Sequence, residues 1–247
     1  MAQPNTVVNR SDVLPATTHM GPVTLLVGDL DALTAYYRDA FLLEVLRQEG
    51  ETVALGRRGV ELLILQRDWS LPPNQPRSAG LYHTAFLFDS KAELATVLAA
   101  ALTHGRAHYV GSGDHAVSEA FYFTDPEGNG VELYADRPRE SWQWSNGSVH
   151  MTTDYLDPVQ FLRAHLTDDS RELVATQAAR QEAGALRQAA VGHVHLQVGD
   201  TATAKDFYVD TLGFETTLEM GNQALFVAAG GYHHHMAMNT WNSLGAG

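Results

Sequence analysis

The stretch GDHAVSEAFYFTDPEGNGVELY, residues 113–134, carries three side chains that could do chemistry together: His115, Tyr122 and Glu132. An imidazole can gain or lose a proton near neutral pH, and a tyrosine hydroxyl can donate or accept a hydrogen bond. The DPEG run at 125–128 predicts a turn between two strands, which would place Tyr122 and Glu132 on one hairpin. A carboxylate inside the apolar strand GVELY is costly to bury unless it is paired or bound to a cation, so Glu132 is a candidate metal ligand.

Two histidines outside this stretch could complete a metal site with Glu132. His83 stands in the apolar run LYHTAFLF, and His193 follows Gly192 at the start of the run HVHLQV. The chain has no cysteine, so any metal must be held by His, Asp or Glu. Two neutral imidazoles and one carboxylate form the facial triad of non-haem iron sites, which leaves coordination positions open for other ligands.

Each of these residues, taken alone, also has a simpler structural explanation. A single histidine in an apolar strand, such as His83, is more often a hydrogen-bonded core residue than a ligand. Glu132 could stand at a strand edge facing water, and His193 and His195 could face solvent from one strand. The run HHHMAMN, residues 233–239, could be an edge strand. The metal interpretation is favoured because the candidate ligands fall at equivalent places in repeated segments.

The repeat is visible when two segments are aligned without a gap. The segments that start at Val23 and Val194 each contain a short alternating strand, an acidic helix start and a helix with an apolar face, followed by strand-like runs. A third copy lies between them. The sequence therefore predicts an α+β protein built from three βαβββ modules: module 1 at 20–70, module 2 at 80–137 and module 3 at 190–243. In module 1, Pro22 takes the place of His193, so modules 2 and 3 are expected to form the cleft that holds the metal.

The modules suggest a domain organisation. We predict an N-terminal domain at 1–137 with modules 1 and 2, a connector at 138–188 with a charged surface helix, and module 3 of a C-terminal domain at 189–247. Because such modules pair, an odd number leaves one without a partner. The closing run NSLGAG resembles a loop that would lead into a fourth module, so a truncated four-module chain is expected.

Composition limits the partners of the chain. The formal net charge is −13, which disfavours binding to nucleic acid or to an anionic membrane. No apolar run approaches the length of a membrane span, and the first twenty residues lack the apolar core of a signal peptide. A soluble cytoplasmic protein is therefore expected. A homo-oligomer is expected as well, because module 1 has no partner module within the chain.

The spacing Gly113-x-His115, six residues, Tyr122, the turn at 125–128 and then Glu132 resembles the signature of extradiol ring-cleavage dioxygenases. These enzymes belong to the vicinal oxygen chelate superfamily, together with glyoxalase I and bleomycin-resistance proteins. Nearly the whole chain is similar to the catechol 2,3-dioxygenase type within this family. The resemblance implies a glyoxalase-like fold of paired βαβββ modules.

The resemblance also assigns roles to residues. It places iron ligands at His83, Glu132 and His193, and it places His115 and Tyr122 beside the substrate. An acid–base histidine is expected in the last strand of module 3, in the run GGYHHHMAM, where His234 is the best match. Since alternate residues of a strand face opposite sides, the neighbouring histidines 233 and 235 would then point away from the site, and a shift of one residue would reverse this.

The implied activity is extradiol ring cleavage. Fe(II), or alternatively Mn(II), would bind a catechol or substituted catechol and O2, and the product would be of the 2-hydroxymuconic semialdehyde type. Two alternatives remain on the same scaffold: a glyoxalase-like isomerase or lyase, which needs a second carboxylate in the site, and a metal-free binding protein of the drug-sequestering kind. Glu61 is the obvious spare carboxylate, but it belongs to module 1.

Overall fold

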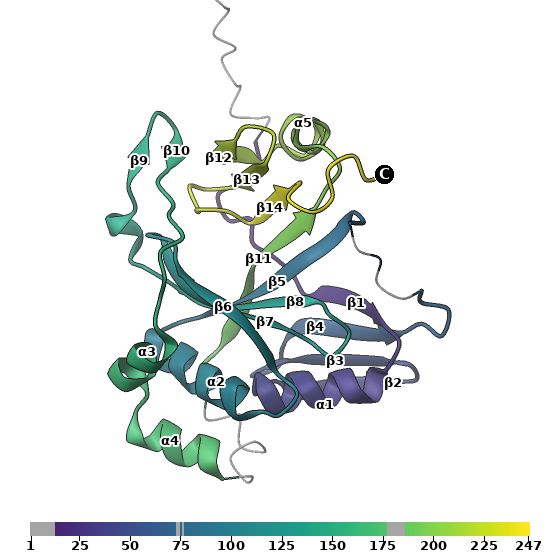
Figure 1. Cartoon of the computed structure of the whole chain (residues 1–247), viewed down its shortest axis with the longest axis vertical. Helices are drawn as coiled ribbons and strands as arrows, with labels where there is room; N and C mark the ends of the chain where they lie inside the picture. Colours follow the sequence, from purple (N-terminus) through teal and green to yellow (C-terminus); the bar gives the residue numbers. More distant parts are fainter. Residues whose placement is uncertain (1–12, 73–74, 76, 177–185) are drawn as a thin grey trace, which may run out of the picture.

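A computed structural model of the chain describes residues 13–72, 75, 77–176 and 186–247. Module 1 is confirmed as one βαβββ unit, whose four strands form a sheet in the order β1-β4-β3-β2 with β1 parallel to β4 (Figure 1). Its elements are β1 (Val23–Val27), α1 (Leu30–Ala40), β2 (Glu44–Glu49), β3 (Thr52–Arg57) and β4 (Val60–Arg67).

Modules 2 and 3 repeat this strand order and share one sheet. The eight strands run β12-β13-β14-β11-β5-β8-β7-β6, and the two first strands, β5 and β11, pair antiparallel at the centre. Module 2 comprises β5 (Gly80–Phe88), α2 (Lys91–Thr103), β6 (His108–Asp114), β7 (Ser118–Thr124) and β8 (Gly130–Asp136). Module 3 comprises β11 (Ala189–Gln197), α5 (Thr201–Lys205), the π-helical segment η4 (Asp206–Thr211), β12 (Glu215–Met220), β13 (Ala224–Ala228) and β14 (Met236–Asn239).

The first helix of each module begins at a side chain that caps it. The carboxylates of Asp29 and Asp200 accept hydrogen bonds from the N–H groups of Ala32 and Thr203, at 3.0 and 2.8 Å. The hydroxyl of Ser90 plays the same part in module 2. Capping satisfies an N–H group that has no partner within the helix and is worth about 1 kcal/mol. The repeated acidic residue after the first strand is therefore a helix start, as predicted.

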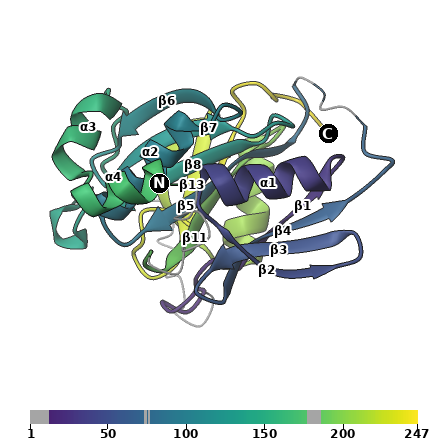
Figure 2. The same cartoon turned by 90° about the horizontal axis from the view of Figure 1, so that it is seen from below.

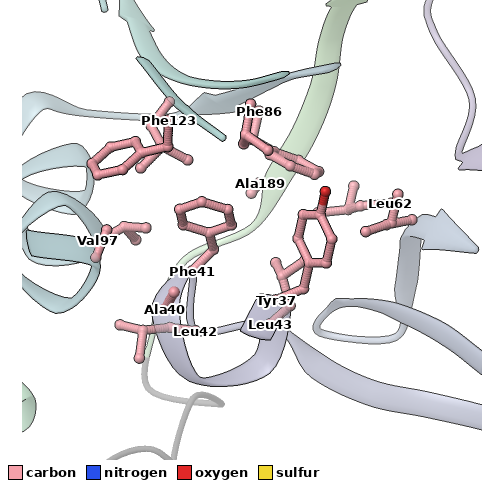
Figure 3. Close-up of a cluster of buried hydrophobic side chains, with 14 of the residues drawn as sticks. Tyr37, Ala40, Phe41, Leu42, Leu43, Leu62, Phe86, Val97, Phe123 and Ala189 are labelled. Atoms are coloured by element: carbon pink, nitrogen blue, oxygen red, sulfur yellow. The ribbon is translucent and has the colours of Figure 1, made fainter. Parts of the chain in front are cut away.

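Modules 1 and 2 share a hydrophobic core beneath the sheets. The ring of Phe41, just after α1, lies among Phe86, Phe123 and Val97 of module 2 (Figure 3). Its centroid is 5.8 Å from that of Phe123. Helices α1 and α2 pack together on this side of the molecule (Figure 2). Module 1 is thus attached to module 2 through helices and not through a shared sheet.

The connector is more structured than the single surface helix that was predicted. It contains the short helix η2 (Arg139–Ser141), the hairpin of β9 (Trp144–Ser145) and β10 (Ser148–Val149), and the helices α3 (Pro158–His165) and α4 (Asp168–Ala175). Helix α4 buries none of its residues and matches the predicted surface helix in part; residues 177–185 lie outside the described part of the chain. The hairpin reaches module 3, where β10 contacts β12. The division into domains at 137 and 188 stays a prediction, although a single sheet joins modules 2 and 3 across the connector.

The run at 233–239 is only partly a strand, contrary to the prediction. Gly230 and Gly231 both have positive φ, 63° and 67°, and turn the chain after β13. Strand pairing resumes only at Met236, which lies opposite Val227. The three histidines therefore belong to a loop that leads into β14.

Among the described residues, none of the helices combines the length and apolar composition needed to cross a bilayer.

Gly192 is a bulge in β11, directly before His193. Val191 pairs with Phe86 and His193 pairs with Ala85, so Gly192 has no partner in β5. A Cβ atom at Gly192 would lie 1.6 Å from the hydroxyl oxygen of Tyr134. Only glycine allows β11 to pass this buried ring, and the bulge re-aims the following side chain.

We therefore expect Gly192→Ala to lower the free energy of unfolding by about 1–3 kcal/mol, the usual cost of overpacking a core. Gly111→Ala is the matched control, because a Cβ at this position in β6 meets no described atom within 4 Å. Urea unfolding of both variants measures the difference. Equal stability of the two variants would show that the close approach at Gly192 does not constrain the fold.

Candidate metal centre

His83, Glu132 and His193 come together on three adjacent strands of the eight-stranded sheet. Their potential ligand atoms all lie within 4.8 Å of one another. Oε2 of Glu132 is 3.0 Å from Nε2 of His83 and 3.0 Å from Nε2 of His193. The structure thus brings together the three residues that the sequence predicted as a ligand set.

Strand register explains this convergence. Ala85 of β5 lies between His193 of β11 on one side and Glu132 of β8 on the other, and Tyr122 of β7 follows next to Glu132. His83 precedes Ala85 by two residues and so faces the same side of the sheet. The small side chain of Ala85 leaves space between the larger groups that surround it. A row across four strands therefore builds the site.

Burial and the neighbouring side chains place Glu132 and His193 in the protonation states that a metal requires. All three are nearly inaccessible, with exposed fractions of 6% for His83, 2% for Glu132 and 1% for His193. Burial alone would raise the pKa of the Glu132 carboxyl, but His193 and His83 outweigh it and hold that pKa well below its ordinary value. Burial lowers the pKa of His193. Glu132 is thus a carboxylate and His193 a neutral imidazole near pH 7, and metals bind these forms.

The donor set fits a divalent metal ion. Nε2 of His83 is buried and has no aligned hydrogen-bond partner among the described residues, although it lies close to the carboxylate. Two imidazole nitrogens directed at one carboxylate oxygen are poorly satisfied by hydrogen bonds alone. A cation between them would take both nitrogen lone pairs and offset the buried negative charge. Nitrogen and oxygen ligands without sulfur suit Fe(II), Mn(II) or Zn(II).

The repeat shows why module 3 supplies no second carboxylate. Val194 pairs with Met236 as Thr84 pairs with Val131, so Ala237 occupies in module 3 the place that Glu132 has in module 2. In module 1 the corresponding residue is Ile64. Glu132 is also the only carboxylate among the described residues that line the cavity over the site. The three-residue ligand set leaves coordination positions open.

A cavity of about 730 Å³ lies over the three residues. Its volume lies within the range of small-molecule sites, about 300–1,000 Å³. The polar lining includes His115, Tyr122 and His234, which are the predicted catalytic residues. The apolar lining comes from both sides of the cavity: Leu81, Val110, Phe123 and Val131 belong to module 2, and Met151, Leu218, Met220, Phe226 and Trp241 to module 3 and the connector.

His115 and Tyr122 form a hydrogen-bonded pair at this cavity. Nδ1 of His115 lies 2.7 Å from the carbonyl oxygen of Thr152, and Nε2 lies 2.6 Å from the Tyr122 hydroxyl. A carbonyl only accepts, so Nδ1–H donates to it and Nε2 of the neutral ring accepts from the tyrosine. Burial, assisted by the charge of Glu132, raises the pKa of Tyr122 well above its ordinary value. Tyr122 is thus a neutral hydrogen-bond donor beside the metal ligands.

Of the three consecutive histidines, His234 lines the cavity. Its ring centroid is 4.1 Å from that of His193. Burial, followed by the neighbouring His193, lowers the pKa of His234 well below its ordinary value, so the ring is neutral. His233 is fully buried against Asp136, and Nδ1 of His235 accepts the N–H of Ala229. The predicted residue is at the site, but loop geometry and not strand alternation places it there.

His195 is a cavity residue that the sequence analysis missed. It is 4% exposed and lines the cavity, with its ring centroid 4.9 Å from that of His83. The side-chain amide of Asn239 lies 3.0 Å from Nε2 of His195. The solvent-facing alternative for His193 and His195 is therefore wrong. Their separation by two residues, which places both on one face of a strand, was the signal that could have identified His195.

Comparison with known proteins identifies the family. The sequence matches the Glyoxalase/Bleomycin resistance protein/Dioxygenase superfamily over residues 19–133 and 190–246, which together contain all three candidate ligands. The chain belongs to this superfamily. The two matched segments hold the three modules, and the connector lies between them. The predicted family and fold class are thereby confirmed.

Two superfamily relatives are dioxygenases. The chain is 40% identical over 230 residues to a catechol-2,3-dioxygenase of Bacillus subtilis (strain 168), a match that covers 91% of this chain and 75% of that protein. It is 35% identical over 81 residues to biphenyl-2,3-diol 1,2-dioxygenase 2 of Rhodococcus globerulus, covering 32% of this chain and 42% of that enzyme. These relatives support the prediction that the chain is a dioxygenase enzyme.

A solved structure supports the fold. A crystal structure of a protein from Bacillus subtilis subsp. subtilis str. 168 aligns with a TM-score of 0.57 at 13% identity, over 93% of this chain and 66% of that chain. The chain therefore spans about two thirds of the length of this structure and less than half of the Rhodococcus relative. At this identity the likeness shows the fold alone.

The metal centre predicts that a divalent ion stabilises the protein. Fe(II) added without oxygen, or Mn(II), should raise the free energy of unfolding by ~2.7 kcal/mol at a free metal concentration about 100 times the dissociation constant. For a chain of this size that is a rise in melting temperature of about 5–10 °C. Thermal unfolding with and without the metal measures it.

Two variants make this measurement specific. Glu132→Gln keeps the shape of the side chain but removes the charge, and should lose most of the metal-dependent shift. His195→Gln alters a buried cavity histidine outside the ligand group and should retain it. A shift of equal size in Glu132→Gln and the parent would contradict the assigned ligand set.

Proposed function

We propose that the chain is an extradiol ring-cleaving dioxygenase that inserts O2 into a catechol or a substituted catechol. The product would be of the 2-hydroxymuconic semialdehyde type. The observation that carries the proposal is the convergence of His83, Glu132 and His193 beneath a cavity that also contains a neutral histidine and a neutral tyrosine. The 40% identity to a catechol-2,3-dioxygenase supports it.

His83, Glu132 and His193 would hold Fe(II), with Mn(II) as the alternative. The open coordination positions of such a triad suit the two oxygens of a catechol and dioxygen. A bound Fe(II) supplies the redox-active site at which a catechol and O2 react. The identity of the metal is part of the proposal, because the donor set also suits other divalent ions.

His234 would be the acid–base residue of this reaction. A catechol hydroxyl must lose a proton when both of its oxygens bind a metal, and a neutral imidazole that lines the cavity can take that proton. The same ring can return the proton to an oxygen that leaves later in the reaction. The low pKa of His234, caused chiefly by burial, keeps the ring in its accepting form before the substrate binds.

His115 and Tyr122 would stabilise negative charge on oxygen at the module 2 side of the cavity. The hydroxyl of Tyr122 is hydrogen-bonded to Nε2 of His115. It would donate to a substrate oxygen either by turning its hydrogen into the cavity, or when Nε2 of His115 carries a hydrogen and donates to the Tyr122 oxygen. Because the carbonyl of Thr152 fixes the His115 ring, only the hydrogen shared by His115 and Tyr122 would have to move when charge develops. Groups that are oriented in advance contribute more to catalysis than groups that must reorient.

The two alternative functions fit the cavity less well. A glyoxalase-like isomerase would need a second carboxylate, and the equivalent positions hold Ala237 and Ile64. Glu61, the spare carboxylate of module 1, forms an ion pair with Arg47 in the other sheet. A metal-free binding protein would have no use for a buried carboxylate between two imidazoles, which carries a desolvation cost without a cation.

A cytoplasmic location and a homo-oligomeric state remain predictions of the sequence.

The proposed reaction is tested by loading the protein with Fe(II) in the absence of oxygen and then adding catechol and air. We expect a yellow ring-cleavage product, whose formation is measured by its absorbance, and the consumption of one O2 per catechol. Protein carrying Glu132→Gln and treated identically should form no product. If the loaded protein contains iron but leaves a series of substituted catechols unchanged, the proposed function is wrong.

The role of His115 is tested by His115→Phe, which keeps a planar ring but removes both nitrogens. Iron content should stay near that of the parent, because His115 contacts Tyr122 and is not in the ligand group. Turnover should fall by about tenfold or more, within the usual range for acid–base groups. His83→Phe is the contrasting variant, which should lose iron and activity together. Unchanged turnover of His115→Phe at equal iron content would refute the role.

A further inference from the structure

A chain of hydrogen bonds connects the cavity histidine His234 to a carboxylate near the protein surface. Nδ1 of His234 lies 2.7 Å from Nδ1 of His233, and Nε2 of His233 lies 2.9 Å from Oδ1 of Asp136. His233 is fully buried, whereas the side chain of Asp136 is 23% exposed. Asp136 ends β8, four residues after Glu132, so both side chains project from the same face of one strand.

The positions of the protons follow from the chemistry of the three groups. A carboxylate only accepts, so Nε2 of His233 carries a hydrogen and donates it to Asp136. A neutral imidazole has one N–H, so Nδ1 of His233 is then an acceptor. The short contact between the two Nδ1 atoms requires one donor, which must be His234. Nε2 of His234 is left with its lone pair.

The reversed arrangement is unfavourable. For His233 to donate to His234 while keeping its bond to Asp136, its ring would have to carry two hydrogens and a full positive charge. That ring is fully buried against Tyr232 and Trp142, with centroid distances of 4.1 and 5.1 Å. Such a ring would form a largely buried ion pair with Asp136, and burying an ion pair carries a desolvation cost, whereas with a single hydrogen on His233 the negative charge of Asp136 stays in contact with water.

We propose that Asp136 and His233 are positioning residues that fix the tautomer and orientation of the His234 ring, with Nδ1–H bound to His233 and the lone pair of Nε2 available to the cavity. A histidine must present a lone pair if it is to remove a proton from a substrate hydroxyl. The catalytic consequence rests on the proposed role of His234, whereas the tautomer is a property of the protein alone.

The arrangement also holds the ring in place. The rings of His233, His234 and His193 lie close together, with His234 4.6 Å from His233 and 4.1 Å from His193. Among the described residues, the contact with His233 is the only hydrogen bond given for Nδ1 of His234. A flip of the His234 ring about its Cβ–Cγ bond would break this hydrogen bond. Strand β8 therefore contributes a metal ligand at Glu132 and, through Asp136, an anchor for the acid–base ring.

The tautomer can be measured directly on the metal-free protein by long-range ¹⁵N–¹H correlation spectra of ¹⁵N-histidine-labelled protein at about pH 8, above the ordinary pKa of histidine. His234→Gln identifies the His234 signals among those of the twelve histidines. We expect the parent to show His234 with its hydrogen on Nδ1. In His233→Phe, which removes the acceptor, the hydrogen should move wholly or partly to Nε2.

Two further variants separate positioning from a general effect on the fold. Asp136→Asn removes the charge from a partly exposed position, and its amide can donate to His233 and so permit the reversed chain; we expect partial transfer of the His234 hydrogen to Nε2. His235→Phe removes the next histidine of the same loop, which bonds to Ala229 and not to His234, and should leave the His234 tautomer as in the parent. If His233→Phe does not fold, the His234 tautomer measured in Asp136→Asn decides whether the positioning role is correct.

The kinetic readout uses the iron-loaded enzyme. His233→Phe should lower kcat for catechol by about tenfold or more where the His234 hydrogen moves almost wholly to Nε2, because a histidine in the wrong tautomer cannot act as a base. Asp136→Asn should lower kcat by a smaller factor, set by the fraction of His234 rings whose hydrogen has moved, and KM and bound iron should change little in both variants. The proposal is overturned if the parent carries the hydrogen on Nε2 of His234, or if both variants retain it on Nδ1. An inactive parent with the expected tautomers would instead refute the proposed function and leave the positioning role supported.

Discussion

One carboxylate oxygen placed between two imidazole nitrogens is the contact on which the architecture of this site depends. Oε2 of Glu132 lies 3.0 Å from Nε2 of both His83 and His193, and all three residues are buried. Such a cluster is unfavourable without a cation, so the fold must hold the groups together against their desolvation cost. It does so by placing them on the three adjacent strands β8, β5 and β11, two of which come from module 2 and one from module 3.

Module 1 supplies no ligand, and its contribution is to support the hairpin that carries Glu132. The carboxylate of Glu127, in the turn between β7 and β8, accepts the N–H groups of Gly28 and Asp29 at the start of α1, at 2.9 and 2.7 Å. Negative charge is favourable at a helix N-terminus. The hydroxyl of Tyr37 donates to Asp125 in the same turn, at 2.9 Å. The polar turn that first marks the hairpin in the sequence is therefore a second contact between modules 1 and 2, besides their shared hydrophobic core.

The repeat and the helix starts could be predicted because each depends on local sequence, and the candidate ligands could be predicted because they fall at equivalent places in the repeat. Asp29 and Asp200 cap helices through neighbouring N–H groups, and equivalent strand positions place His83 and His193 alike. Features that depend on distant packing could not be predicted. Gly230 and Gly231, both with positive φ, turn the chain so that the histidines at 233–235 lie in a loop before β14. The β9–β10 hairpin is positioned by its contact with β12. The burial of His195 against β5 and Asn239 also depends on distant packing, although its spacing of two residues from His193 indicated that both histidines share a face.

The chemical asymmetry of the site follows from a break in the symmetry of the repeat. Each of modules 2 and 3 contributes one histidine from its first strand, but only module 2 carries a carboxylate in its last strand, because Ala237 replaces it in module 3. A fourth ligand at this place would occupy a coordination position that a catechol and O2 need. Module 3 instead uses the loop before β14 to bring His234 to the cavity, while the β6–β7 loop of module 2 brings His115. The two copies thus bring different side chains to one cavity, His234 from module 3 and His115 with Tyr122 from module 2, because each copy carries different residues beside the candidate metal ligands.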